Sequence, residues 1–141
     1  MTSVGVIGLG DMGSGLAKNL IANGFETWGR DLLDHRQTAF ADMGGHAAAD
    51  TAEVGRNAQT VFVMVMKGAE AHEVILGDNG LAQTMAPGGV ILLTATIKPA
   101  EARAIGLALD GTGLHLIDSP VSGGYPGAQS GTLTMMAAAI S

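Results

Sequence analysis

Apolar runs alternate with segments of helical periodicity along the whole chain, and this alternation is the feature that most constrains its fold. The segments "TVFVMVM" (residues 60–66) and "GVILLTAT" (residues 89–96) are almost continuously apolar, which is typical of parallel strands covered on both faces. Each connection between parallel strands must cross a face of the sheet. The pattern therefore predicts an α/β fold with a doubly wound, mostly parallel sheet and helices on both faces.

The expected strands and helices alternate along the chain, apart from the last two strands. We expect strands at residues 3–8, 25–30, 46–48, 60–66, 89–96, 113–118 and 132–138. We expect helices at residues 12–23, 33–43, 69–76 and 99–110, and a short one after Asp50. Gly24 fits the position after a helix end, Asp50 and Glu53 fit a capping pair, and Pro99 fits the first turn of a helix.

Length and composition limit the classes of protein. A chain of 141 residues with 47% hydrophobic residues buries one core, so residues 1–141 are expected to form a single domain. The net charge of −6 without a basic block argues against a nucleic-acid partner. The chain has no cysteine, and its four histidines lie far apart, so no metal site is expected. No signal peptide or membrane span is recognisable, and we expect a cytoplasmic protein.

A glycine-rich turn joins the first strand to the first helix. The segment "GLGDMG" places glycines at positions 8, 10 and 13. Gly8 permits a tight turn, Gly10 lets a pyrophosphate approach the backbone, and Gly13 lets the helix pack against the sheet. The N-H groups at the helix start attract phosphate. This Rossmann-like turn predicts that residues 8–13 (Gly8, Leu9, Gly10, Asp11, Met12 and Gly13) bind a dinucleotide, although Asp11 brings a carboxylate near the expected anion.

An acidic residue stands where a dinucleotide site needs one. Asp31 ends the second expected strand, 18 residues beyond Gly13, where a carboxylate accepts hydrogen bonds from the adenosine ribose. Leu32 and Leu33 follow, whereas a 2′-phosphate calls for a cation. The sequence therefore predicts NAD as the cofactor in preference to NADP. NADP stays the alternative, because Arg30 and Arg36 are cations close enough in the sequence to reach a 2′-phosphate.

These segments together resemble a known family. "GVIGLGDMGSGLAKNL", "DSPVSGG" and "GTLTMM" are similar, in order and spacing, to segments of the β-hydroxyacid dehydrogenases. That family includes 3-hydroxyisobutyrate dehydrogenase and L-threonate dehydrogenase, and 6-phosphogluconate dehydrogenase is a more distant relative. The resemblance implies hydride transfer between a nicotinamide and a small 3-hydroxy acid.

The resemblance also implies roles for residues beyond the turn. Val65 and Met66, at the end of the fourth expected strand, would line the cofactor groove, and Thr96, at the end of the fifth, would approach the nicotinamide. Ser122, Gly123 and Gly124 would hold the substrate carboxylate, since a hydroxyl and consecutive N-H groups form an anion-binding nest.

The catalytic lysine of this family, in a G-x-x-K-x-x-x-N pattern, is expected beyond Ser141, as is the family's helical substrate and oligomerisation domain. No catalytic residue is therefore assigned within the chain, and Lys98 is expected to be an exposed lysine. Two interpretations stay open. The chain is the NAD-binding domain of a hydroxyacid dehydrogenase, or it is a non-catalytic dinucleotide-binding module or truncated product that self-associates through an exposed apolar face.

Overall fold

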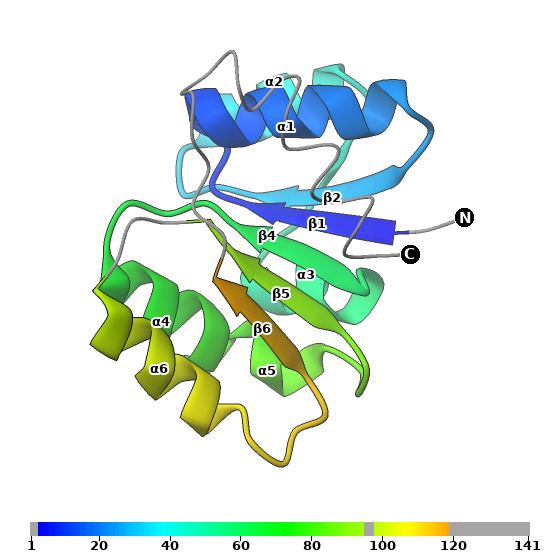
Figure 1. The fold of residues 1–141 in the computed structure, drawn as a ribbon. Coiled ribbons are helices and arrows are strands. Elements are labelled where there is room, and N and C mark those ends of the chain that lie inside the picture. Colours follow the sequence, from blue (N-terminus) through cyan, green and yellow to red (C-terminus); the bar gives the residue numbers. More distant parts are fainter. Residues whose placement is uncertain (1–2, 95–97, 119–141) are drawn as a thin grey trace.

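A parallel sheet forms the centre of the molecule. The computed structural model describes residues 3–94 and 98–118. The strands are β1 (Ser3–Ile7), β2 (Glu26–Arg30), β3 (His46–Ala47), β4 (Thr60–Val63), β5 (Val90–Leu93) and β6 (His115–Asp118). They form one 6-stranded sheet in the order β3-β2-β1-β4-β5-β6, and every pairing is parallel (Figure 1).

Helices cover the sheet on both faces, as the sequence predicts (Figure 1). They are α1 (Asp11–Ala22), α2 (Asp34–Asp42), α3 (Thr51–Asn57), α4 (Gly68–Leu76), α5 (Leu81–Thr84) and α6 (Pro99–Ala108). Helices α1 and α2 contribute to one buried cluster, and α3 to α6 contribute to the other. Val61 and Val63 belong to the second cluster and Phe62 to the first. The three apolar residues 61–63 of β4 therefore alternate between the two clusters, and both faces of the strand are buried.

The local signals for helix ends are confirmed. Gly24 follows the last residues of α1 with a φ of +87°. The Asp50 side chain accepts a hydrogen bond from the Glu53 N-H at 2.8 Å, and Glu53 accepts one from the Ala49 N-H at 2.8 Å. Pro99 is the first residue of α6. The Asp50 side chain supplies an acceptor for an N-H group that α3 cannot satisfy internally.

Some elements differ from the expected ones, and one expected strand lies outside the described residues. Strand β4 ends at Val63 and β5 at Leu93, so both are shorter than their apolar runs. The short helix α5 has no counterpart among the expected elements, because a single turn leaves no periodic pattern. The strand expected at residues 132–138 lies outside the described residues.

The order of the sheet reverses between β1 and β4. The chain moves outward from β1 to β2 and β3, then returns to place β4 on the other side of β1. In open parallel sheets the crevice at the carboxyl ends of two such strands is where ligands bind. The glycine-rich turn follows β1 at this edge. Among the described residues, no helix is long and apolar enough to cross a membrane.

Candidate dinucleotide-binding site

The turn after β1 is built on glycine for steric reasons. Gly8 has a φ of +96°, a conformation that side chains with a Cβ rarely adopt. A Cβ on Gly8 would also overlap the carbonyl oxygen of Met64, the residue after β4. The turn therefore lies directly against the end of β4, at the crevice between the two strands.

The start of α1 packs on this turn. A Cβ on Gly13 would overlap the carbonyl oxygen of Gly8, so only glycine allows the helix to come this close. Gly10 is the N-cap of α1 and has an ordinary φ of −69°. A Cβ there would stand 3.8 Å from its nearest neighbour, the Arg36 guanidinium. The backbone of Gly10 is thus open, as close approach by a phosphate requires.

The other residues of the turn differ in exposure. Leu9 is 4% exposed and belongs to the core, so only its main chain can take part in binding. Met12 is half-buried. Asp11 is exposed and is the first residue of α1. The first N-H groups of α1 have no acceptor within the helix, and its positive end favours an anion.

Asp31 directly follows β2 and joins the two parts of the predicted site. Its Oδ2 accepts a hydrogen bond from the Leu9 N-H at 2.7 Å, inside the glycine-rich turn. Its Oδ1 accepts one from the Leu33 N-H at 2.9 Å. The Arg36 Nη1 lies 3.4 Å from Oδ2. Asp31 therefore fixes the turn after β1 to the loop after β2.

The Asp31 carboxyl is held in its charged form although its side chain is only 7% exposed. Burial alone raises the pKa of the Asp31 carboxyl, because it disfavours the charge. The N-H donors of Leu33 and Leu9 and the charge of Arg36 outweigh burial, and the net pKa is below its ordinary value. A charged, partly satisfied carboxylate at this edge is an acceptor for hydroxyl groups.

Gln37 is a supporting residue that the sequence analysis missed. Its Oε1 accepts a hydrogen bond from the Asp31 N-H at 2.8 Å, and its Nε2 donates to the Ala48 carbonyl oxygen at 2.7 Å. This one side chain ties the end of β2 to the residue after β3. No sequence signal reveals it, because a glutamine on a helix has no motif and Ala48 is distant in the chain.

The remaining predicted residues divide into two groups. Val65 and Met66 were expected at the end of the fourth strand. They lie instead in the loop between β4 and α4, where Met66 is 85% exposed. Thr96 and the group Ser122, Gly123 and Gly124 lie outside the described residues. Lys98 is exposed, as expected, and its N-H donates to Glu101 Oε1 at 3.1 Å.

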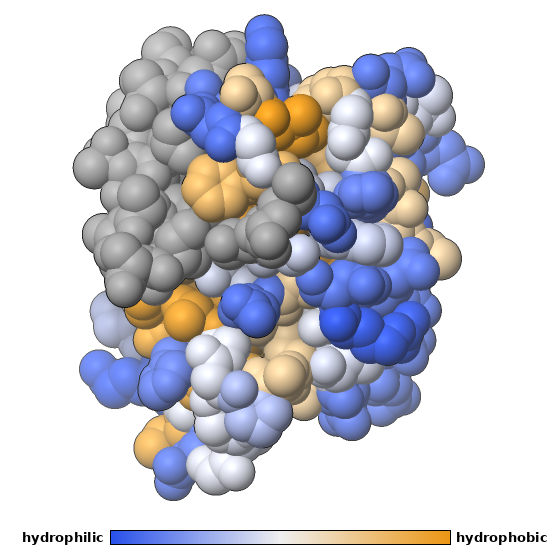
Figure 2. Space-filling view, turned by 90° about the vertical axis from the view of Figure 1, so that its right-hand side faces the viewer, coloured by the Kyte–Doolittle hydropathy of each residue, from blue (hydrophilic) through white to orange (hydrophobic). Residues whose placement is uncertain are grey.

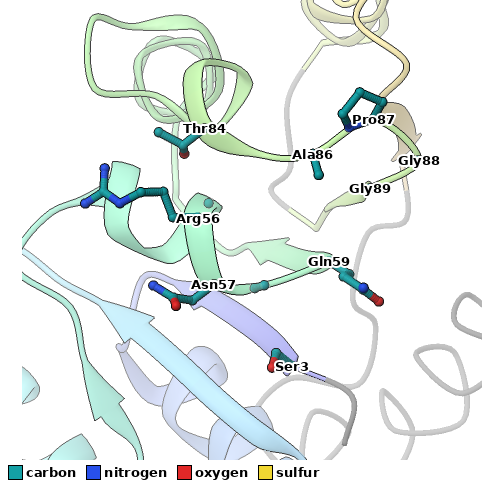
Figure 3. Close-up of a pocket in the computed structure, with 11 residues that line it drawn as sticks. Ser3, Arg56, Asn57, Gln59, Thr84, Ala86, Pro87, Gly88 and Gly89 are labelled. Carbon is teal, nitrogen blue, oxygen red and sulfur yellow. The ribbon is translucent and has the colours of Figure 1, made fainter.

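An open cavity of about 450 Å³ lies elsewhere on the molecule (Figure 3). Its lining includes Ser3, Gln59 and Gly89, which stand at or before the amino ends of β1, β4 and β5. The Arg56 and Gln59 side chains extend in opposite directions (Figure 3), whereas a ligand site has converging polar groups. Figure 2 shows the side where β1 begins, with many hydrophilic residues on its described surface. The candidate dinucleotide site therefore remains the crevice at the carboxyl ends of the strands.

Comparison with known proteins agrees with this geometry. A family model described as the NAD binding domain of 6-phosphogluconate dehydrogenase matches residues 3–140. The chain belongs to this family. Membership of this family agrees with the parallel sheet and with the glycine-rich turn at the point where the strand order reverses.

Relatives of this NAD-binding domain include L-threonate and 3-hydroxyisobutyrate dehydrogenases, which confirms the family resemblance. L-threonate dehydrogenase from Cupriavidus necator is 41% identical over 134 residues, which is 95% of this chain and 45% of that protein. The structure of a 3-hydroxyisobutyrate dehydrogenase from Salmonella typhimurium matches with a TM-score of 0.86 and 33% identity, over 93% of this chain and 46% of that one. The structure of Psf3 in complex with NADP⁺ and 2-OPP matches with a TM-score of 0.83 and 28% identity, over 91% and 45%. The chain spans a little under half the length of each.

Proposed function

We propose that this chain binds NAD(H) through residues 8–13 and Asp31, as the cofactor domain of an oxidoreductase. The reaction is hydride transfer between the nicotinamide and a small 3-hydroxy acid of the L-threonate or 3-hydroxyisobutyrate type. The observation that carries the proposal is the hydrogen bond from the Leu9 N-H to Asp31 Oδ2, at 2.7 Å. It holds the phosphate-binding turn and the ribose-binding carboxylate in one rigid unit before any ligand arrives.

Asp31 supports NAD as the preferred cofactor. Each carboxylate oxygen has two lone pairs, and Oδ1 accepts one hydrogen bond among the described residues, from Leu33. A ribose hydroxyl can donate to such an oxygen. The 2′-phosphate of NADP has no proton to donate in its dianionic form, and its charge has the same sign as that of the carboxylate, so Asp31 alone disfavours it.

The substrate class rests on the relatives and on the sequence. The relatives are named for L-threonate and 3-hydroxyisobutyrate, both of which are hydroxycarboxylates. Ser122, Gly123 and Gly124 remain the predicted carboxylate-binding residues, and Val65, Met66 and Thr96 the predicted groove residues. We propose residues 1–141 as one dinucleotide-binding domain.

Thermal denaturation of the chain with added dinucleotides tests the cofactor. A ligand that binds only the folded state raises the melting temperature as its concentration increases. NADH is expected to produce a saturable rise, and NADPH a smaller rise at equal concentration. No rise with NADH at any concentration would refute the proposal.

A second titration tests the substrate class and separates the two interpretations left open. With saturating NAD⁺, L-threonate and 3-hydroxyisobutyrate are expected to raise the melting temperature further. Threitol, which has a hydroxymethyl group in place of the threonate carboxylate, is the matched control and is expected to have no effect. Equal behaviour of threonate and threitol would favour a dinucleotide-binding module without a hydroxyacid site.

A further inference from the structure

Two neighbouring helices begin at the carboxyl edge of the sheet, and one carboxylate lies at the start of both. Helices α4 and α6 follow β4 and β5 and pack against each other (Figure 1). Glu101 is in the first turn of α6, and its Oε1 accepts a hydrogen bond from the Lys98 N-H at 3.1 Å. The same carboxylate lies where a Cβ on Gly68, the first residue of α4, would stand. Glycine at this position therefore leaves the room that brings the Glu101 carboxylate to the start of the neighbouring helix.

The start of α4 is complemented by this carboxylate from outside the helix. The first N-H groups of α4 have no acceptor within the helix, and its positive end favours an anion. The N-cap residue Lys67 is itself a cation, and its side chain makes no capping hydrogen bond with the described residues. Glu101 supplies the negative charge instead. One side chain thus caps α6 through a hydrogen bond and complements the charge at the start of α4.

The loop at residues 64–67 joins the phosphate-binding turn to this contact. At one end, the Met64 carbonyl oxygen lies directly against Gly8 of the turn. At the other end, the loop runs into α4, where the Glu101 carboxylate lies. The middle of the loop has little packing of its own, since Met66 is 85% exposed. The position of this loop relative to α6 therefore depends on Glu101.

We propose that Glu101 is a positioning residue for the nicotinamide half of the cofactor. The inference rests on the proposed function and deepens it, because Val65, Met66 and Thr96, the residues predicted along that part of the groove, belong to the segments after β4 and β5. With Glu101 in place, the loop after β4 is ordered before the ligand arrives, and binding does not carry the entropy cost of ordering it. The adenosine half, at Asp31, lies on the other side of β1 and does not depend on this contact.

Dissociation constants of NADH and 5′-AMP, measured by calorimetry, test this role, because 5′-AMP lacks the nicotinamide half. The variant is Glu101→Ala. The control is Glu73→Ala, which removes an exposed glutamate from α4 beyond its first turn. We expect Glu101→Ala to weaken NADH about three-fold or more and to change 5′-AMP by less than about two-fold. Glu73→Ala is expected to leave both dissociation constants unchanged. A merely structural role of Glu101 would not separate the two ligands.

A second pair of variants tests the contact without a ligand. Gly68→Ala places a methyl group where the carboxylate lies and is expected to displace it, whereas Gly106→Ala in α6 has room for its Cβ. In hydrogen exchange of the free chain, Gly68→Ala and Glu101→Ala are each expected to speed exchange of the amides at residues 65–70. The double variant is expected to add nothing further, because both changes remove the same contact. Gly106→Ala is expected to leave these amides unchanged.

The outcomes separate this inference from the proposed function. If Glu101→Ala weakens NADH and 5′-AMP by the same factor, or weakens neither, the inference is wrong, while the cofactor assignment stands. Additive effects of Gly68→Ala and Glu101→Ala on hydrogen exchange would show that Glu101 does not act at the start of α4 and would also overturn it. If the unmodified chain binds no NADH, the proposed function fails, and the exchange measurement still decides whether Glu101 holds the loop after β4.

Discussion

Replacement of Asp31 by Asn is predicted to destabilise the protein even without a ligand. The Asp31 carboxylate accepts hydrogen bonds from the Leu9 and Leu33 N-H groups through different oxygens. An asparagine side chain at this position has only one carbonyl oxygen, so one of these N-H groups would face an NH2 donor. The Asp31 side chain is 7% exposed, so water cannot easily replace the lost acceptor.

The size of the loss follows from these contacts. One hydrogen bond to a charged group contributes about 1.5 to 3 kcal/mol. The half-exposed contact with Arg36 adds at most about 1 kcal/mol. We therefore expect Asp31→Asn to lower the free energy of unfolding by about 2 to 3 kcal/mol at neutral pH, measured by urea denaturation.

The pH dependence checks the cause. The pKa of Asp31 in the folded protein is below its ordinary value, so its stabilising contribution is present above the unfolded pKa, near 3.9, and is lost as the pH falls through the folded pKa. The difference between the native chain and Asp31→Asn is expected to be constant from neutral pH to about pH 5 and to shrink below about pH 4. A loss below about 0.5 kcal/mol, or a difference that does not shrink in acid, would refute this reasoning.

Three further predictions concern the same region. Gly13→Ala is expected to lower the free energy of unfolding, measured by urea denaturation, by about 1 to 3 kcal/mol, because the added Cβ overlaps the Gly8 carbonyl oxygen. The control Gly106→Ala, whose Cβ has room, is expected to change that free energy by less than about 1 kcal/mol. Equal losses in the two variants would contradict the packing argument. Gln37→Ala removes two hydrogen bonds and is expected to cost about 1 to 3 kcal/mol by the same measurement; no loss would show that these bonds are not needed. Asp31→Asn is expected to weaken NADH more than NADPH in calorimetry, and an equal effect would remove Asp31 from cofactor choice.

Local sequence signals predict much of this fold and of the candidate site. The apolar runs indicate parallel strands because β4 and β5 are buried on both faces. The spacing of Gly8 and Gly13 is a usable sequence signal because their positions in the fold leave no room for a Cβ, so only glycine fits there. Asp31 is recognisable because it directly follows a strand at a fixed distance from the turn.

Features that depend on distant contacts could not be predicted. Strand β4 ends at Val63, level with the ends of its neighbours β1 and β5, and the apolar residues 64–66 do not reveal where a neighbouring strand stops. The bond from Gln37 to Ala48 depends on how α2 packs beside β3. The position of Arg36 over Gly10 depends on the path of the loop between β2 and α2, which no local pattern specifies.

Calorimetric titration of NADH into the native chain and into Gly10→Ala tests most directly whether the turn at residues 8–13 binds a dinucleotide. A Cβ on Gly10 fits the folded protein, 3.8 Å from its nearest neighbour, but it covers the backbone that a phosphate must approach. We predict saturable binding to the native chain and binding at least about ten-fold weaker to a Gly10→Ala variant that remains folded. Equal affinity of the two proteins, or no binding to the native chain, would contradict the account.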